Sequence, residues 1–258
     1  FDSIDDIQKQ FHHLVRIVPG NGMVIAPEGV ESVTRVLEKG CWSGQQSFSI
    51  SGDGDWRADL LSDDGSLFEI RFQGENCGSV NWSHTGRHNV SNGLAAIAAA
   101  RHVGVTPDIA VQALCEFAGV KRRMECLAEV KVASNSGSYS VKVYDDFAHH
   151  PTAIATTLQG LRAQVGTDKI VVLIEPRSNT MRMGVHQSLL GRACMEADDV
   201  LWYQPHGVDW DLDEVVHHSP VPAKLVDNLD DLISDAIMLS GLAEKSHIVI
   251  MSNGGFGG

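Results

Sequence analysis

Four short polar segments carry most of the side chains that could do chemistry, and each follows an apolar run. They are Asp145–Pro151, Glu175–Arg182, Gln204–Gly207 and Ser252–Gly255. The first segment reads Asp-Asp-Phe-Ala-His-His-Pro, and this mixture of carboxylates and imidazoles could bind a metal, hold a ribose or exchange protons near neutral pH. The structural alternative is that one Asp caps the next helix and one His packs on its neighbour. One cap does not need two Asp and two His, so the cluster favours a functional site.

Two arginines in the second segment, Arg177 and Arg182, flank Ser178 and Asn179. Two guanidinium groups at this spacing could bind one carboxylate in a bidentate manner, and solvated surface arginines are the alternative. The glycine-rich residues 253–258 could offer backbone N–H groups to an anion. They lack the G-x-G-x-x-G spacing, however, and an ordinary turn is the simpler interpretation.

The elements that position these segments alternate between apolar runs and helical patterns. Strands are predicted at 127–132, 139–144, 170–174, 200–203 and 247–251, and helices at 151–165, 185–197 and 228–239. The acidic run Asp209–Glu214 is interpreted as a solvated loop. Such alternation predicts a parallel sheet covered on both faces. In an open parallel sheet, ligands bind beyond the carboxyl ends of the strands, so the four polar segments should meet at one edge.

The first half of the chain has a different texture. We predict a helix at 4–18, a strand at 23–26, a helix at 31–38, two or three antiparallel strands within 43–82, and helices at 86–100 and 107–117. Asn89 or Ser91 could cap the start of the helix at 86–100. A boundary at Lys121–Glu125 divides the chain into domains 1–120 and 121–258.

Composition excludes several classes of protein. The 258 residues carry a formal charge of −13, which disfavours a nucleic-acid partner, and no apolar run approaches the roughly 20 residues of a membrane span. The five cysteines form no C-x-x-C pair, which disfavours a zinc site and a disulfide framework and fits the cytoplasm. The first residues resemble no signal peptide, and we expect a fragment that begins and ends within a longer protein.

Three motifs, in this order, resemble the Mur ligase family: Gly86–Ala100, Gly119–Glu125 and Asp145–Thr152. The resemblance covers essentially the whole chain. It implies an α/β fold in which the C-terminal part of a Mur ligase central domain, with a small antiparallel sheet, precedes a Rossmann-like, mostly parallel sheet domain. Within the family, Phe11–Arg16, Glu175–Arg182 and Met251–Gly258 most resemble the members that act in murein recycling.

The resemblance implies an ATP-dependent ligase with Mg²⁺ that joins UDP-N-acetylmuramate to L-alanyl-γ-D-glutamyl-meso-diaminopimelate through an acyl phosphate. Peptidoglycan recycling, cell-wall biogenesis, cell shape and cell division would be its context, and a cytoplasmic monomer its form. Carried over by position, the ATP contacts would be His88, Asn89, Arg123 and Asp146. The tripeptide contacts would be His149, Arg177, Ser178, Asn179 and Arg182. A core-packing role for His88 and an ion pair between Arg123 and Glu125 are the alternatives.

Two other functions stay open. One is a ligase that adds free L-alanine, although a His-Arg-Tyr sequence is expected in those members where this chain has Arg177–Thr180. The other is a non-catalytic nucleotide-binding or interaction module on the same scaffold. The chain contains no G-x-x-x-x-G-K-[ST] phosphate loop, so we expect the phosphate cradle to lie upstream. We therefore expect these 258 residues alone to be inactive.

Overall fold

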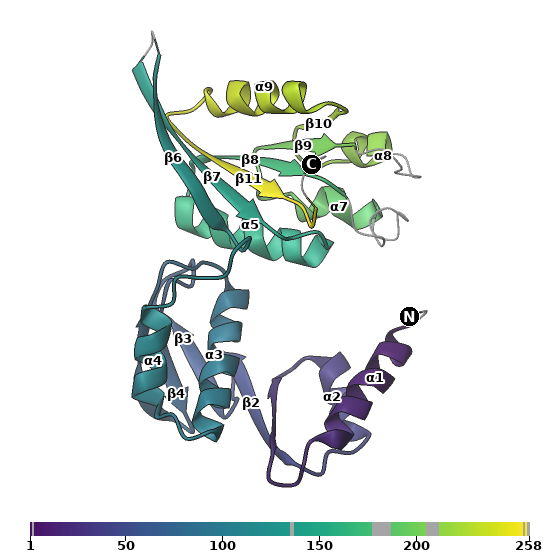
Figure 1. Ribbon diagram of the computed structural model, residues 1–258, viewed down its shortest axis with the longest axis vertical. Helices are drawn as coiled ribbons and strands as arrows, with labels where there is room; N and C mark the ends of the chain where they lie inside the picture. The colour runs from purple at the N-terminus through teal and green to yellow at the C-terminus, as the bar shows by residue number, and fades with distance from the viewer. Residues whose placement is uncertain (2, 135–136, 177–186, 205–211, 255, 257–258) are drawn as a thin grey trace. The chain divides into compact units, whose positions relative to one another are not determined.

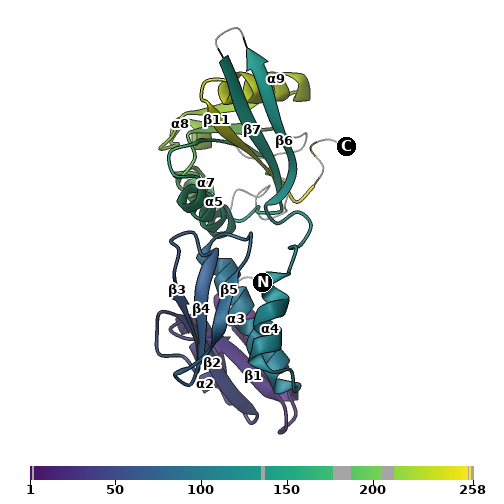
Figure 2. The ribbon, with the colours of Figure 1, turned by 90° about the vertical axis from the view of Figure 1, so that its left-hand side faces the viewer.

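The computed structural model describes residues 1, 3–134, 137–176, 187–204, 212–254 and 256 (Figures 1 and 2). The chain divides into two compact units, Phe1–Ala118 and Gly119–Gly258. This division lies within a few residues of the predicted boundary.

The first unit contains four helices and five strands among its described residues. In chain order they are α1 (Ile4–Ile17), β1 (Met23–Pro27), α2 (Glu31–Glu38), β2 (Gly44–Ile50), β3 (Trp56–Leu60), β4 (Leu67–Phe72), β5 (Glu75–Asn81), α3 (Arg87–His102) and α4 (Pro107–Cys115). Ser3 caps α1 by accepting from the backbone N–H of Asp6, and Asp5 and Asp6 stabilise the positive end of that helix.

The sheet of this unit has the order β1-β2-β3-β4-β5. Strands β3, β4 and β5 pair antiparallel, which confirms the predicted antiparallel strands. Strands β1, β2 and β3 pair parallel, so the antiparallel prediction is wrong for β2. Trp56, Phe68 and Ile70 are fully buried and pack with one face of α3 and α4, so the core lies between the sheet and these two helices.

The start of α3 corrects one prediction. Gly86, at φ 91°, is the N-cap residue and offers no side chain, so neither Asn89 nor Ser91 caps the helix. The Asn89 amide instead donates to the carbonyl of Thr85 at 2.8 Å, because Asn89 lies within the first turn rather than before it. The glycine supplies a positive φ that other residues rarely adopt.

The second unit alternates strands and helices as the apolar pattern predicts. Its described elements are β6 (Glu125–Ser134), β7 (Gly137–Asp146), α5 (Pro151–Val165), β8 (Lys169–Ile174), α7 (Gln187–Ala193), β9 (Asp199–Tyr203), α8 (Leu212–His217), β10 (Ala223–Val226), α9 (Leu229–Ser240) and β11 (Lys245–Met251). The sheet order is β10-β9-β8-β11-β7-β6. Every pair is parallel except β6 with β7, which confirms the mostly parallel, Rossmann-like sheet.

Helices cover both faces of this sheet (Figure 1). On one face, α5, α7 and α8 pack against Ile170, Val172 and Ile174 of β8. On the other face, α9 packs against Val171 and Leu173 of the same strand. Strand β8 is therefore apolar at successive positions, since both sets of alternating side chains are buried.

Helix α8 and strand β10 were not predicted. Asp213 and Glu214 belong to the first turn of α8, so the solvated-loop interpretation of the acidic run is wrong for residues 212–214, and residues 209–211 lie outside the described part. Leu212 and Val215 are 1% and 3% exposed, and their burial holds this short helix. The two acidic residues sit at its positive N-terminal end.

A buried histidine predicts how the stability of the chain depends on pH. His247 is 6% exposed, and its Nδ1 and Nε2 lie 3.2 Å from Tyr144 Oη and 3.4 Å from Asp168 Oδ2. Burial lowers the pKa of His247, although the hydrogen bond to Asp168 acts in the opposite direction. The unfolded chain therefore binds this proton more readily than the folded chain does.

We expect the free energy of unfolding to fall as the pH drops below about 6.5, by at most roughly 1.4 kcal/mol per pH unit from this group. Urea unfolding between pH 7.5 and 5.5 measures the slope. His247→Gln should flatten the slope, whereas His13→Gln, at an exposed position, should leave it unchanged. Equal slopes in the two variants would contradict the assignment.

Candidate functional site at the carboxyl edge of the second sheet

The carboxyl ends of β7, β11 and β8 lie side by side in the second sheet. Asp146 ends β7, Glu175 follows β8, and Ser252 follows β11. Backbone hydrogen bonds extend this pairing beyond the strands, since Glu175 N donates to Met251 O and Ser252 N donates to Asp146 O, each at 3.1 Å. The sequence prediction that these segments meet at one edge is confirmed for the described residues.

Asp146 is 3% exposed, and its carboxylate binds two backbone groups. Oδ2 accepts from Met124 N at 2.8 Å, and Oδ1 accepts from Ala148 N at 2.7 Å. Burial raises the pKa of Asp146, while these two N–H groups and Arg123 oppose the rise. Asp146 therefore joins the entry to β6 to the segment that leads into α5.

Arg122 binds three carboxyl-edge groups with one guanidinium. Nη2 donates to Ser252 O at 2.5 Å and to Gly254 O at 3.0 Å, and Nε donates to Asp145 Oδ2 at 3.2 Å. The residue adopts φ 59°, a left-handed conformation that non-glycine residues seldom take. Its backbone N–H donates to Glu125 Oε2 at 2.9 Å, which helps to hold that conformation.

Glu175 binds the segment after β11 from the other side. Oε2 accepts from Ser252 Oγ at 2.5 Å and from Phe256 N at 3.0 Å, and Ser252 Oγ accepts from Gly254 N at 2.8 Å. Glu175 and Ser252 are each 1% exposed. Because the N–H groups of Gly254 and Phe256 are used within the turn, they do not form the anion cradle considered for residues 253–258. The ordinary-turn interpretation is confirmed for them.

The histidines of the first polar segment have structural contacts. His149 Nδ1 lies 2.9 Å from Phe147 O, so it must donate to that carbonyl, and the ring packs edge-on against Phe147 at 5.2 Å. His150 is the N-cap of α5 and accepts from Thr152 N at 3.2 Å. This is the structural alternative weighed from the sequence, except that a histidine rather than an aspartate forms the cap.

Arg123 is an exposed cation at the same edge. Its guanidinium carbon lies 5.3 Å from the centre of the Phe147 ring, and the Arg122 guanidinium lies 5.3 Å from the same ring. The aromatic ring therefore orients both cations. Asp146, His149 and Arg123 are thus close together in the second unit.

The other predicted residues are placed elsewhere or are not described. His88 and Asn89 lie in the first turn of α3, in the first unit, where His88 is partly buried. Arg177, Ser178, Asn179 and Arg182 fall in residues 177–186, outside the described part of the chain. The predicted carboxylate-binding role of that segment stays a prediction.

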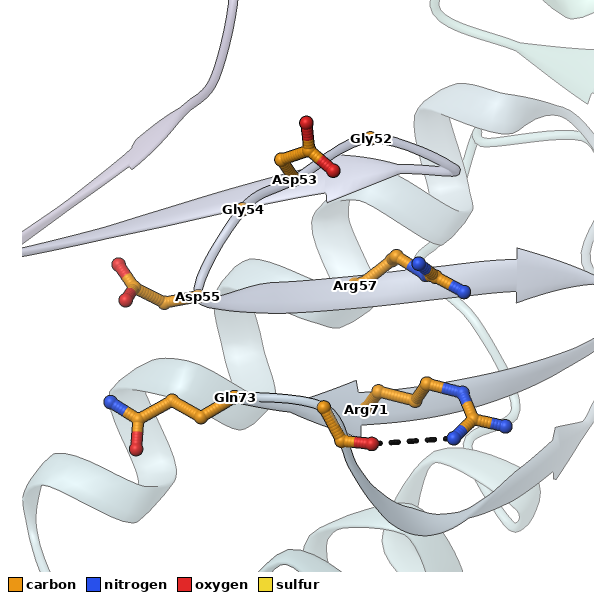
Figure 3. A pocket seen from close by; sticks show the side chains of 8 residues that line it. Gly52, Asp53, Gly54, Asp55, Arg57, Arg71 and Gln73 are labelled. Carbon is orange, nitrogen blue, oxygen red and sulfur yellow. Dashed lines mark hydrogen bonds between the residues drawn. The ribbon is translucent and has the colours of Figure 1, made fainter.

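A pocket of about 270 Å³ lies in the first unit, at the open end of β3 and β4. Figure 3 shows Arg57 and Arg71 extending in one direction from the two strands, and Asp55 and Gln73 in the opposite direction. Both arginines bind Asp59, and Arg71 also binds Glu69, so these two carboxylates balance the two positive charges. No predicted site residue lines this pocket. Within the described ranges, no group of three or more His, Cys, Asp or Glu is placed to hold a metal ion.

Sequence reasoning placed Glu175 and Ser252 at the start of two polar segments but gave neither a role, and it missed Arg122 as a residue that shapes the edge. Glu175 and Ser252 stand first after their strands, and that position was a usable signal. Arg122 gave no such signal, because its role depends on a positive φ and on contacts with residues about 130 positions away. No helix in the described residues has the length and apolar character that crossing a bilayer requires.

Comparison with known proteins identifies the family. The family model described as Mur ligase, glutamate ligase domain, matches residues 122–254, which is more than half of the chain. The chain belongs to the Mur ligase family. The crystal structure of the UDP-N-acetylmuramate-alanine ligase of Thermotoga maritima has a similar fold, with a TM-score of 0.73 over 99% of this chain and 53% of that one. At 20% sequence identity, this likeness concerns the fold alone.

Among Mur ligases with curated names, an Escherichia coli relative is 45% identical over 100% of this chain and 54% of its own length. It is named UDP-N-acetylmuramate–L-alanyl-γ-D-glutamyl-meso-2,6-diaminoheptandioate ligase, as is a Haemophilus influenzae relative at 40% identity. The crystal structure of a murein peptide ligase from Psychrobacter arcticus is 42% identical with a TM-score of 0.69, over 99% of this chain and 53% of that one. The chain spans about half the length of these relatives.

Asp146→Ala tests the structural role of the buried carboxylate. The change leaves the N–H groups of Met124 and Ala148 without their acceptor, so we expect the free energy of unfolding to fall by about 1–3 kcal/mol. Asp145→Ala is the matched control, because Asp145 forms a partly exposed ion pair with Arg122 that contributes at most about 1 kcal/mol. Urea unfolding measures both values. Equal losses in the two variants would show that Asp146 is not the principal acceptor.

Proposed function

We propose that the protein containing this chain is an ATP-dependent ligase that joins UDP-N-acetylmuramate to L-alanyl-γ-D-glutamyl-meso-diaminopimelate. The carboxylate of the muramate would be phosphorylated, and the amine of the peptide would attack the acyl phosphate to form an amide. Murein recycling in the cytoplasm would be the setting, because ATP and a UDP-linked sugar are the co-substrates. We further propose that the enzyme acts as a monomer.

One observation supports this function over its alternatives. The relatives named for the tripeptide substrate match the whole chain at 45% and 40% identity. A relative named UDP-N-acetylmuramate–L-alanine ligase, from Caldanaerobacter subterraneus, is 29% identical over 69% of this chain. The tripeptide is therefore a better supported amine substrate than free L-alanine. A non-catalytic module is the remaining alternative.

We propose that His88 and Asn89 approach the adenine of ATP, Arg123 its phosphates and Asp146 its ribose. Arg123 fits this role because it is exposed and is oriented by Phe147, so its charge is available to an anion. The Asp146 carboxylate already accepts two backbone N–H groups, so a ribose hydroxyl would have to share one of its oxygens. When bound, ATP supplies the phosphoryl group that gives the carboxylate a leaving group.

We propose that His149 and the segment containing Arg177, Ser178, Asn179 and Arg182 bind the tripeptide. Donation from His149 Nδ1 to Phe147 O leaves Nε2 of the neutral ring as an acceptor. The two arginines would bind carboxylates of the peptide. We also propose Mg²⁺ as the ion that accompanies ATP, with the phosphates of ATP among its ligands.

The substrate assignment is tested with the full-length protein. Phosphate release is measured with ATP, UDP-N-acetylmuramate, and either the tripeptide or free L-alanine. We expect turnover that depends on the tripeptide, with kcat/KM at least about a hundredfold above that for L-alanine, since the larger substrate offers several more polar contacts of about 1 kcal/mol each. Preference for L-alanine would support the alanine-adding alternative. No turnover with either amine would support the non-catalytic alternative.

Two variants of the same enzyme separate the nucleotide residues from the peptide residues. Arg123→Ala should raise KM for ATP about tenfold with little change in KM for the tripeptide, because one charge contact is worth roughly 1.4 kcal/mol or more. His149→Ala should do the reverse. Steady-state kinetics with each substrate varied in turn give both constants. A shift of the same KM in both variants would contradict the division of roles.

A further inference from the structure

We infer that Asn253 binds the amine substrate, with its side-chain oxygen accepting a hydrogen bond from an N–H group of the peptide. This inference rests on the proposed function and names a residue of the same site. Asn253 Oδ1 is buried, and none of the described residues forms a hydrogen bond with it. Buried acceptors of this kind are rare in folded proteins, and each calls for an explanation such as a ligand.

The position of Asn253 supports a ligand as that explanation. It is the second residue after β11, and β11 lies between β7 and β8 in the sheet. Asn253 therefore lies beyond the carboxyl end of a central strand. This is the edge at which parallel sheets bind their ligands. Asp146 and Glu175 end or follow those neighbouring strands.

Two charged side chains fix the backbone on both sides of Asn253. Glu175 binds the hydroxyl of Ser252, and Arg122 binds the carbonyls of Ser252 and Gly254. Phe256 stacks on Tyr203, with ring centres 5.7 Å apart, and its N–H is bound by Glu175. The turn after β11 therefore has a fixed conformation before any ligand binds, and this fixes the position of the Asn253 backbone.

The chemistry of the unpaired atom selects its ligand. An amide oxygen only accepts hydrogen bonds, so it cannot bind the oxygens of a carboxylate or a phosphate. The tripeptide offers backbone amide N–H groups and two amino groups, that of L-alanine and the distal one of diaminopimelate, whereas free L-alanine offers a single amino group. The amino group of adenine is also a donor, and a change in KM for ATP would distinguish it from the peptide.

The test uses steady-state kinetics of the full-length protein, with the tripeptide and ATP varied in turn. Asn253→Leu removes the acceptor at similar size, and we expect it to raise KM for the tripeptide about tenfold while KM for ATP changes less than about twofold. Asn253→Asp keeps an acceptor oxygen and should restore KM for the tripeptide to within about threefold of wild type. If Asn253 only stabilised the fold, the two variants would not differ in KM for the tripeptide while leaving KM for ATP unchanged.

A second pair of variants tests the turn that holds Asn253. Ser252→Ala removes the hydroxyl that links Glu175 to Gly254 and should raise KM for the tripeptide by several-fold, roughly half of the Asn253→Leu effect in free-energy terms. Ser246→Ala is the matched control. Ser246 lies at the opposite end of β11, is equally buried at 1% exposure, and donates to Ser240 O at 2.6 Å. This control should leave both KM values unchanged.

Three results would overturn the inference. They are an unchanged KM for the tripeptide in Asn253→Leu, equal effects of Leu and Asp at this position, or a rise in KM for ATP alone. The wild-type enzyme reports on the proposed function separately. If it uses L-alanine instead of the tripeptide, the proposed function fails, and the same variants are then judged by KM for L-alanine.

Discussion

Three buried or half-buried charges bind backbone groups at the carboxyl edge of the second sheet, and the arrangement of the site depends on these contacts. Arg122 donates to two carbonyls, and Asp146 and Glu175 each accept from backbone N–H groups. Removing such a charge from water costs several kcal/mol unless hydrogen bonds replace the solvent. The backbone must therefore take the path that supplies those hydrogen bonds. The segments after β7, β8 and β11 are tied together as a result.

These hydrogen bonds determine which polar groups of the carboxyl edge are available to a ligand. Some groups that the sequence assigns to ligand binding form hydrogen bonds within the protein. The carboxylate of Asp146, for example, accepts from two backbone N–H groups. Among the described residues, the groups that we propose for ligands are carried on this fixed backbone: the Arg123 guanidinium, the second ring nitrogen of His149 and the side-chain amide of Asn253. In the proposed reaction, an amine and an acyl phosphate would have to be held in fixed orientation. An edge that is rigid before substrate binds would help to meet that requirement.

The sequence predicted the alternation of the second unit and the edge where its polar segments meet, because buried parallel strands such as β8 are apolar at successive positions, here from Ile170 to Ile174. It did not predict α8, whose six residues carry too short a pattern and whose burial depends on contacts with the rest of the core. The cap of α5 by His150 rather than by an aspartate, and the role of Arg122, were also missed. Both depend on contacts or backbone angles that side-chain type alone does not specify.

The carboxyl edge of the second sheet is held by its own charged side chains in the absence of substrate. Amide hydrogen exchange of the unliganded protein measures this property. We expect the N–H groups of Met124, Ala148, Gly254 and Phe256, each hydrogen-bonded to a side chain of the edge, to exchange as slowly as those of neighbouring strands. Exchange of these four amides at the rate of exposed loops would show that the edge is not held before substrate binds.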